Sequence, residues 1–268
     1  LYEQLLGTVS GTAETMIVVA RAIAAVDIIQ SLSWLARGRN LVRPTLSQKR
    51  VFLVQSARHL VVESLLGTEK FVANDIALTE KQPQMLITGP NMAGKSTVMR
   101  QAALIAILNQ IGSFVPAQAA ELCIFDRVFT RVGASDDLAR GQSTFMVEMT
   151  ESANILRRAT SRSLVILDEV GRGTSTQDGL AIAKAILEDI ARRIDCMCLF
   201  ATHYHELVPF AQCFESIALM QTEVMHNSER IKFSHRLISG ACASSFGIDV
   251  ALLAGIPQIV IHRARTLL

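Results

Sequence analysis

Residues 85–97 read Met85-Leu-Ile-Thr-Gly-Pro-Asn-Met-Ala-Gly-Lys-Ser-Thr97, a short apolar strand that runs into a glycine-rich turn and then a helical stretch. Gly89 and Gly94 let the backbone bend so tightly that successive N–H groups point inward around an anion, at the positive end of a helix dipole. Lys95 adds a charge for outer phosphates, and Ser96 offers a hydroxyl to the magnesium ion that accompanies a nucleoside triphosphate. The stretch therefore predicts a phosphate-binding loop; an ordinary glycine-rich turn is the alternative.

The composition is that of a globular chain. Hydrophobic residues make up 50% of its 268 residues, which is ample for one large domain, or one domain with an appendage. The net charge of +2 and the aromatic content of 5% give no basis for strong nucleic-acid binding by this stretch itself. The five cysteines show no metal-binding spacing, so we expect reduced, mostly buried thiols in a cytosolic protein.

The N-terminal stretch is apolar but does not have the pattern of a membrane span. No uninterrupted apolar run approaches the roughly 18 residues that a span needs, and the closest, residues 16–29, carries Arg21 and Asp27. Apolar residues instead repeat every seven positions, as at Leu5 and Val19, and predict one long helix over residues 1–36. The chain opens inside this helix, so we expect it to be a piece of a longer protein.

The rest of the chain predicts a layered α/β domain. After the first helix, residues 51–54 and 60–63 alternate in polarity and predict edge strands of a sheet. Strands are then expected at residues 85–88, 122–130, 164–167 and 197–201, and helices at 95–111, 144–159 and 177–193. This alternation of strands and helices is typical of a sheet layered with helices.

The C-terminal part adds a hairpin and two helices. Residues 216–225 and 230–238 predict two strands that join the sheet as a hairpin. Short helices are expected over 247–254 and 257–268, with Pro257 at the first turn of the second helix.

Two adjacent carboxylates follow the most apolar strand. Residues 164–167 are apolar on both faces, as in a central parallel strand, and Asp168 and Glu169 stand at its carboxyl end, where α/β sheets bind ligands. Asp168 can hold magnesium or its waters, and Glu169 can orient and deprotonate the water that attacks a γ-phosphate. Two solvated acids that open a loop are the alternative.

Three further features surround this pair in the sequence. Two glycines and three hydroxyl residues in 171–176 indicate close approach of the backbone to a ligand or partner, or else a flexible loop. His203, after strand 197–201, is suited to sense a γ-phosphate, although a lone histidine at a strand end is as often structural. Ser143 and Thr144 precede a helix, where hydroxyls cap the N-terminus and can also bind an anion, including one held by another subunit.

Four motifs together resemble the ATPase domain of the MutS family of DNA mismatch-repair proteins. They are Gly89-Pro-Asn-Met-Ala-Gly-Lys-Ser-Thr97, Ser143-Thr-Phe-Met-Val-Glu-Met149, Leu167-Asp-Glu-Val-Gly-Arg-Gly-Thr-Ser-Thr176 and Ala201-Thr-His203, in matching order and spacing. The resemblance covers essentially the whole chain. It implies a P-loop NTPase of the ABC-ATPase type, with the end of a lever helix at 1–36, an ATPase domain at 37–246 and a helix-turn-helix dimerisation element at 247–268.

The resemblance also implies roles for individual residues. ATP or ADP with Mg²⁺ would be bound by Gly89, Pro90, Asn91, Met92, Ala93, Gly94, Lys95, Ser96 and Thr97, with Phe71, Val72 and His235 at the adenine. Ser96 and Asp168 would bind the metal ion. The catalytic residues would be Glu169, Lys95 and His203. Ser143 and Thr144 would contact the ATP of a partner subunit. Ala93 departs from the commoner glycine and is tolerated only if its φ is negative.

As partners, the resemblance implies a homodimer, mismatched duplex DNA bound through domains absent from this chain, and a downstream MutL-type repair protein. It implies a bacterial cytoplasmic location without a membrane. Two other functions stay open from the residues. A transporter-type ATPase would need a Leu-Ser-Gly-Gly-Gln-like signature, whose place Ser143-Thr-Phe takes, and a nucleotide-gated dimerisation module would show negligible turnover.

Overall fold

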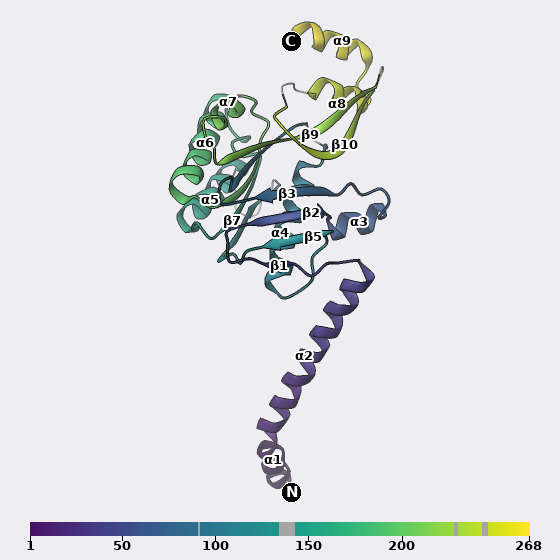
Figure 1. Cartoon of the computed structure of the whole chain (residues 1–268), viewed down its shortest axis with the longest axis vertical. Helices are drawn as coiled ribbons and strands as arrows, with labels where there is room; N and C mark the ends of the chain where they lie inside the picture. Colours follow the sequence, from purple (N-terminus) through teal and green to yellow (C-terminus); the bar gives the residue numbers. More distant parts are fainter. Residues whose placement is uncertain (91, 134–142, 228–229, 243–245) are drawn as a thin grey trace.

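The structure is a computed structural model that describes residues 1–268 except 91, 134–142, 228–229 and 243–245. Its body is a mixed α/β fold with two β-sheets, and the N-terminal helices and the C-terminal helices project from opposite ends (Figure 1). This confirms the expected layering of sheet and helix.

The larger sheet has six strands and carries the residues of interest at one edge. Its order is β10 (Arg230–Ser239), β9 (Ile217–Asn227), β4 (Gln84–Thr88), β8 (Met197–Ala201), β7 (Leu164–Asp168) and β6 (Val128–Arg131). All neighbouring pairs are parallel except β9 and β10, which form the expected antiparallel hairpin. The carboxyl ends of β4, β7 and β8 therefore meet at one edge, as parallel pairing requires.

Strand β7 shows why this sheet is buried on both faces. Leu164 and Ile166 belong to one apolar cluster, whereas Val165 and Leu167 belong to a second cluster on the opposite face. Successive side chains of a strand point to opposite faces, so four consecutive apolar residues can fill two cores. The prediction of a parallel strand buried on both faces is confirmed, although β7 lies next to the edge strand β6 and not at the centre of the sheet.

A second sheet packs against the first through helix α4 (Lys95–Gln110), whose buried residues share a cluster with both sheets. Its order is β1 (Thr45–Leu46), β5 (Ala119–Leu122), β2 (Phe52–Ala57) and β3 (Asn74–Leu78). Two expectations were wrong here. The edge strand expected at 51–54 is the inner strand β2, and the strand expected at 122–130 is two strands in different sheets, because the chain leaves the smaller sheet after Leu122 and joins the larger one at Val128.

The edge strand expected at residues 60–63 was also wrong. Leu60–Leu66 is helix α3, whose N-terminus is capped by His59, the ring of which accepts a hydrogen bond from the Val62 N–H at 3.4 Å. Arg58 donates two hydrogen bonds to the buried carboxylate of Glu63, at 2.8 and 3.0 Å. The cap and this ion pair stabilise a helix that the valine-rich local sequence does not indicate.

Helices cover the other face of the larger sheet. They are α5 (Thr144–Arg158), α6 (Thr176–Asp189), which continues as a π-helical turn (Ile190–Ile194), and α7 (Leu207–Ala211). Their apolar faces bury the second cluster, which includes Leu187 and Phe200. Cys123, Cys196, Cys198 and Cys242 are buried, Cys213 is exposed, and these five cysteines form no disulfide bond with one another.

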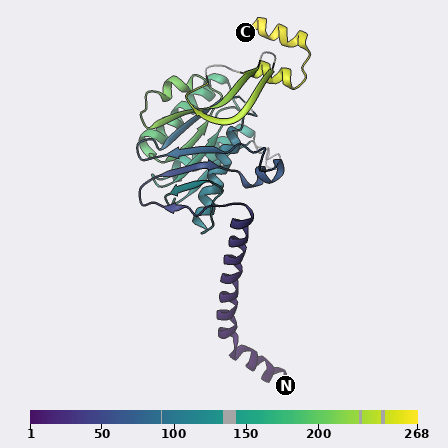
Figure 2. The same cartoon turned by 45° about the vertical axis from the view of Figure 1, so that its right-hand side comes forward.

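The two ends of the chain are helical and little buried. Helix α1 (Tyr2–Gly11) and helix α2 (Ala13–Gly38) replace the single expected helix; the break at Thr12 follows Gly11, which weakens helix propensity. Helices α8 (Gly247–Leu253) and α9 (Gln258–Leu267) lie at the opposite end (Figure 2).

Helix α2 is long and apolar, although Arg21 and Asp27 interrupt its apolar run. Among the described residues it alone has the length and composition of a membrane span, with 26 residues. Length and composition of one helix are weak evidence, because core helices and leader segments share them.

Candidate functional site

The loop after β4 has a shape that only glycine permits at its first position. Gly89 has φ of 132°, and a Cβ there would collide with the hydroxyl of Thr222 on β9. Gly94, with φ of 99°, precedes the first turn of α4. The loop therefore wraps the N-terminus of a 16-residue helix, where unpaired N–H groups and the helix dipole favour an anion.

Lys95 lies inside this loop. Its side chain is 3% exposed, and Nζ donates hydrogen bonds to the carbonyl oxygens of Gly89 at 2.5 Å and Pro90 at 3.0 Å. Burial lowers the pKa of Lys95 to about 8, against the raising effect of Glu169 and Asp168. The ammonium group is thus held at the centre of the loop, next to two carboxylates.

The backbone conformation of the loop is compatible with alanine at position 93. Ala93 is buried and is not among the residues with positive φ, as its substitution for glycine required. The left-handed conformation falls instead on Met92, with φ of 68° and an exposed side chain. Asn91, predicted to contact phosphate, lies outside the described residues.

The carboxylate pair ends β7 beside this loop. Asp168 is 7% exposed and its Oδ1 has no hydrogen-bond partner within the described part of the chain. Burial raises the pKa of Asp168, although the Ser96 hydroxyl lowers it. Glu169 follows with φ of 58°, a left-handed conformation that is uncommon in a residue other than glycine.

Glu169 is engaged by a histidine and an arginine side chain. Nε2 of His203 contacts one carboxylate oxygen, and Nη1 of Arg172 contacts the other. Burial raises the pKa of Glu169, but His203 and Arg172 outweigh it and lower the pKa to about 2. Glu169 is therefore a charged hydrogen-bond acceptor near neutral pH, and the structure brings His203 beside it.

Two neighbouring cavities flank the loop and share Met92 and Ser96. The first, of about 240 Å³, is lined by Leu66, Lys70, Phe71, Val72, Pro90, Met92, Gly94, Lys95, Ser96, Thr97 and His235. The second, of about 500 Å³, is lined by Met92, Ser96, Arg100, Arg131, Gly133, Thr144, Glu148, Asp168, Glu169, Arg172 and Gly173. The first joins aromatic side chains to the loop, and the second joins the loop to the carboxylates.

Ser143 and Thr144 begin helix α5 in different settings. The Ser143 hydroxyl accepts a hydrogen bond from the Met146 N–H at 3.2 Å, which confirms it as the helix cap. Thr144 lines the second cavity of this same chain. Their expected contact with a partner's nucleotide stays a prediction.

The sequence analysis did not predict the buried contacts that join Glu148, at this cavity, to the loop after β7. Glu148 on α5 accepts a hydrogen bond from the Gly171 N–H at 2.5 Å and lies 3.7 Å from Nη2 of Arg131. The Tyr204 hydroxyl donates to the Gly171 carbonyl at 2.8 Å. Glu148 stands inside the motif 143–149, but nothing local indicates that its partner is 23 residues away.

The oxygen donors of Ser96 and Asp168 fit a magnesium ion that binds together with a nucleotide. No cluster of three or more His, Cys, Asp or Glu side chains suited to a metal occurs among the described residues. Ser96 and the unpartnered Oδ1 of Asp168 line the same cavity. Magnesium usually takes one or two protein oxygens and completes its shell with water and substrate phosphates, so this sparse oxygen set suits a nucleotide-bound ion.

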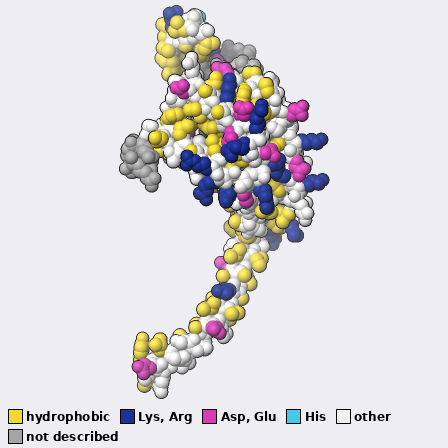
Figure 3. Space-filling model, turned by 90° about the vertical axis from the view of Figure 1, so that its left-hand side faces the viewer, with side chains coloured by type: hydrophobic (Ala, Val, Ile, Leu, Met, Phe, Trp, Pro, Cys, Tyr) yellow, Lys and Arg dark blue, Asp and Glu magenta, His cyan; other side chains and the backbone are white. Residues whose placement is uncertain are grey.

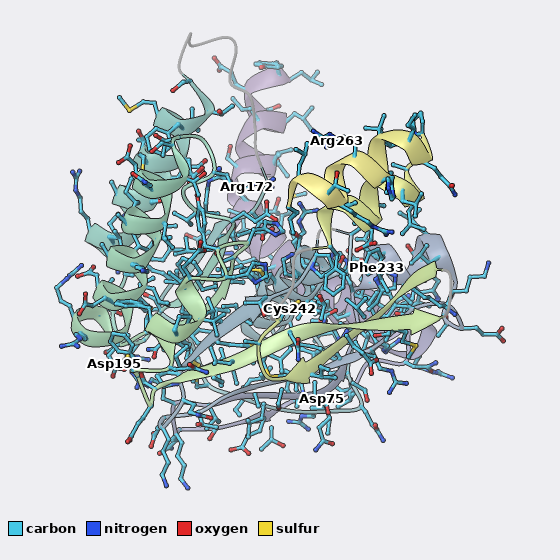
Figure 4. All side chains as sticks on the ribbon, turned by 90° about the horizontal axis from the view of Figure 1, so that it is seen from above. Asp75, Arg172, Asp195, Phe233, Cys242 and Arg263 are labelled. Atoms are coloured by element: carbon cyan, nitrogen blue, oxygen red, sulfur yellow. The ribbon has the colours of Figure 1, made fainter. Side chains whose placement is uncertain are left out.

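Figure 4 looks onto the end from which the C-terminal helices project. Arg172 and Cys242 lie toward the middle of this view, and Asp195, at the opposite end of β8, lies near the rim. The fold and site together define a mixed α/β protein with a glycine-rich loop, a buried lysine and a carboxylate pair around two neighbouring cavities.

Comparison with known proteins agrees with this class. Residues 85–268 match MutS domain V, and this chain belongs to the MutS family. It is 49% identical to the DNA mismatch repair protein MutS of Lawsonia intracellularis over 100% of the chain, and 52% identical to that of Acetivibrio thermocellus over 93%. The chain spans 30% and 29% of the lengths of these relatives.

Proposed function

We propose that the chain binds ATP with Mg²⁺ and hydrolyses it slowly, as the ATPase part of a DNA mismatch-repair protein. The observation that carries this proposal is the pair of neighbouring cavities that share Met92 and Ser96. One holds Phe71 and His235, and the other holds Asp168 and Glu169. A purine nucleotide is divided in the same way, with an aromatic base at one end and charged phosphates at the other.

The first cavity would receive the adenosine end. Phe71 and His235 would stack on adenine, with Val72 beside it, because aromatic rings bind bases through their faces. The phosphates would extend over the loop formed by Gly89, Pro90, Asn91, Met92, Ala93, Gly94, Lys95, Ser96 and Thr97. Such a loop of the P-loop NTPase type, in an ABC-ATPase arrangement, cradles phosphates with backbone N–H groups.

The second cavity would hold the reacting phosphate. Ser96 and Asp168 would hold Mg²⁺, partly through water, and the bound ion would neutralise charge on the phosphate oxygens. Glu169 would orient the attacking water by accepting its hydrogen bond, as a carboxylate that stays charged can. Lys95 would stabilise charge on the outer phosphates, and His203 would lie beside the γ-phosphate.

The intact protein would work as a homodimer. Residues 1–36 would be the end of a lever helix that couples ATP state to DNA, 37–246 the ATPase domain and 247–268 a dimerisation element. Ser143 and Thr144 would complete the partner's nucleotide site. Mismatched duplex DNA, bound by parts outside this chain, and a MutL-type protein would be partners, in the cytoplasm.

Two substitutions test the proposal by separating binding from turnover. Lys95→Ala should abolish nucleotide binding, because it removes the buried charge for the phosphates. Glu169→Gln should retain ATP binding and lower turnover by about 100-fold or more, as expected for loss of a group that positions the nucleophile. Calorimetry and phosphate release measure the two effects.

The matched control is Glu188→Gln, which alters an exposed carboxylate paired with Arg192 at 3.1 Å on the outer face of α6–η2. It should behave as wild type. Undiminished turnover by Glu169→Gln would remove that residue from its role, and wild-type protein that binds ATP without turnover at any protein concentration would favour the nucleotide-gated module.

A further inference from the structure

Asn74 lies behind the first cavity, at the start of β3, and is 6% exposed. Its Nδ2 donates hydrogen bonds to the carbonyl oxygens of His235, at 2.9 Å, and Val72, at 3.3 Å, and its Oδ1 accepts from the Leu237 N–H at 2.6 Å. Two carbonyl partners require the amide nitrogen and one N–H partner requires the amide oxygen, so the partners themselves orient this side chain.

His235 is displayed by an irregularity in β10. The pairing of β10 with β9 shifts register between Phe233 and Leu237, and His235 within this bulge has φ of 59°. The bulge is held on its other side by Ser234, whose hydroxyl donates to the Glu223 carbonyl at 3.2 Å. A left-handed conformation in a non-glycine residue costs free energy, so neighbouring contacts must hold it.

One amide therefore ties together two walls of the cavity that come from distant parts of the chain. Phe71 and Val72 precede β3, and His235 stands 161 residues after Asn74. Figure 4 labels Asp75 and Phe233, which adjoin these two segments on β3 and β10. Gly94 closes the same cavity, with a Cβ position 3.5 Å from Nδ1 of His235.

We propose that Asn74 is a positioning residue that sets the spacing between the Phe71–Val72 wall and His235, and so determines how tightly the site holds the nucleobase. This inference rests on the proposed function. Asn74 lies behind the base and makes no hydrogen bond to the phosphate loop among the described residues. Its loss should therefore affect the base and leave phosphate binding unchanged.

Two variants change the amide in different ways. Asn74→Asp keeps the size of the side chain and the acceptor for Leu237 N–H, but sets a carboxylate oxygen against two carbonyl oxygens. Asn74→Ala removes all three hydrogen bonds and leaves the Leu237 N–H without its partner. Asn109→Ala is the matched control, since Asn109 is also a buried asparagine, 7% exposed, but lines a different cavity with Arg43 and Phe114.

The experiment compares ADP with inorganic pyrophosphate, each with Mg²⁺, by titration calorimetry on the full 268-residue chain. The dissociation constant of pyrophosphate divided by that of ADP reports how much the nucleoside contributes to binding. Both Asn74 variants should lower this ratio by about tenfold, the loss expected for misplacement of stacked and hydrogen-bonded groups, with pyrophosphate affinity changed less than about twofold. Asn109→Ala should leave the ratio unchanged.

Other outcomes would contradict either the positioning role of Asn74 or the proposed function, and the two cases can be told apart. Equal weakening of both ligands, or no weakening of either, would overturn the positioning role, since Asn74 would then support only the fold or nothing at the site. Equal affinity of the wild-type chain for ADP and pyrophosphate would overturn it as well, while leaving a phosphate site. Wild-type protein that binds neither ligand would instead refute the proposed function. Thermal unfolding identifies a misfolded variant, and the isosteric Asn74→Asp then decides.

Discussion

At the scale of single residues, three of the six non-glycine residues with positive φ among the described residues line the two neighbouring cavities, and the others are Asn40, Ser56 and Asp195. Met92, Glu169 and His235 all have positive φ, at 68°, 58° and 59°, although none is glycine. Each conformation costs about 1 kcal/mol or more and persists only where surrounding contacts hold it. All three line these cavities, so the strain supports the assignment of the site.

Lys95 connects burial to pH dependence. Burial lowers its pKa from 10.5 to about 8, so the folded chain loses this proton more readily than the unfolded chain. Burial of the charged lysine therefore lowers the free energy of unfolding below pH 8, and this loss disappears as the pH rises to 10.5. Without nucleotide, the unfolding free energy of wild type relative to Lys95→Met should rise by about 3 kcal/mol across this window, measured by urea denaturation.

The control for this prediction is Lys81→Met, which removes an exposed lysine and should give a difference that is flat with pH. A flat difference for Lys95→Met as well would mean that the lysine is hydrated and that its buried position is wrong.

At the scale of elements, helix α5 and the loop after β7 are joined by buried contacts. Glu148 accepts from the Gly171 N–H, and a Cβ at Gly173 would lie 2.8 Å from that of Phe145. A Cβ at Gly171 would meet the Gly179 carbonyl at 2.5 Å. The glycines of the 171–176 segment thus allow the backbone to pack against α5 and α6 of the same chain, whereas the expected approach to a ligand or partner stays a prediction.

Glu148→Gln tests this junction. Glutamine can still accept the Gly171 N–H but leaves Arg131, which is 8% exposed, without its buried counter-charge. We expect a loss of about 2 kcal/mol in unfolding free energy, below the usual cost of breaking a buried pair, because Arg131 also lies 2.9 Å from Glu151.

The control is Glu151→Gln, since the Glu151 side chain is 46% exposed and should contribute less than about 1 kcal/mol. Removing both charges in Arg131→Met/Glu148→Gln should recover part of the loss. Equal losses in the two single variants would show that burial of the Arg131–Glu148 pair does not matter.

At the scale of the whole molecule, both ends present apolar side chains to solvent. Figure 3 shows hydrophobic side chains along the N-terminal helices and on the C-terminal helices, while charges of both signs cover much of the body. On α9, Ile259 is 80% exposed, Val260 52% and Leu267 70%. Exposed apolar groups of this kind are typical of surfaces that bind protein.

Removal of the residues after 246 should therefore weaken the proposed dimer, with a dissociation constant at least about tenfold higher in sedimentation experiments. Ile259→Lys should act in the same direction in the intact chain, whereas Gln258→Lys, at the exposed neighbouring position, should not. An unchanged dissociation constant in the truncated chain would place the dimer interface elsewhere.

Local sequence was enough for the features that depend on neighbouring residues. The apolar run before Asp168 predicts a strand buried on both faces, because side chains alternate along a strand. The spacing of Gly89, Gly94 and Lys95 predicts a loop that packs around a helix N-terminus, and Ser143 predicts a helix cap.

Only the tertiary structure decided where separate segments meet. Residues 122–130 carry no local sign that the chain changes sheets, and residues 60–63 become a helix through the cap of His59 and the pairing of Arg58 with Glu63. The roles of Asn74 and Glu148 were likewise invisible in sequence, because their partners lie up to 163 and 23 residues away. Periodicity and turn chemistry act between neighbours in the chain, whereas the width of a binding cavity depends on contacts between segments that only folding brings together.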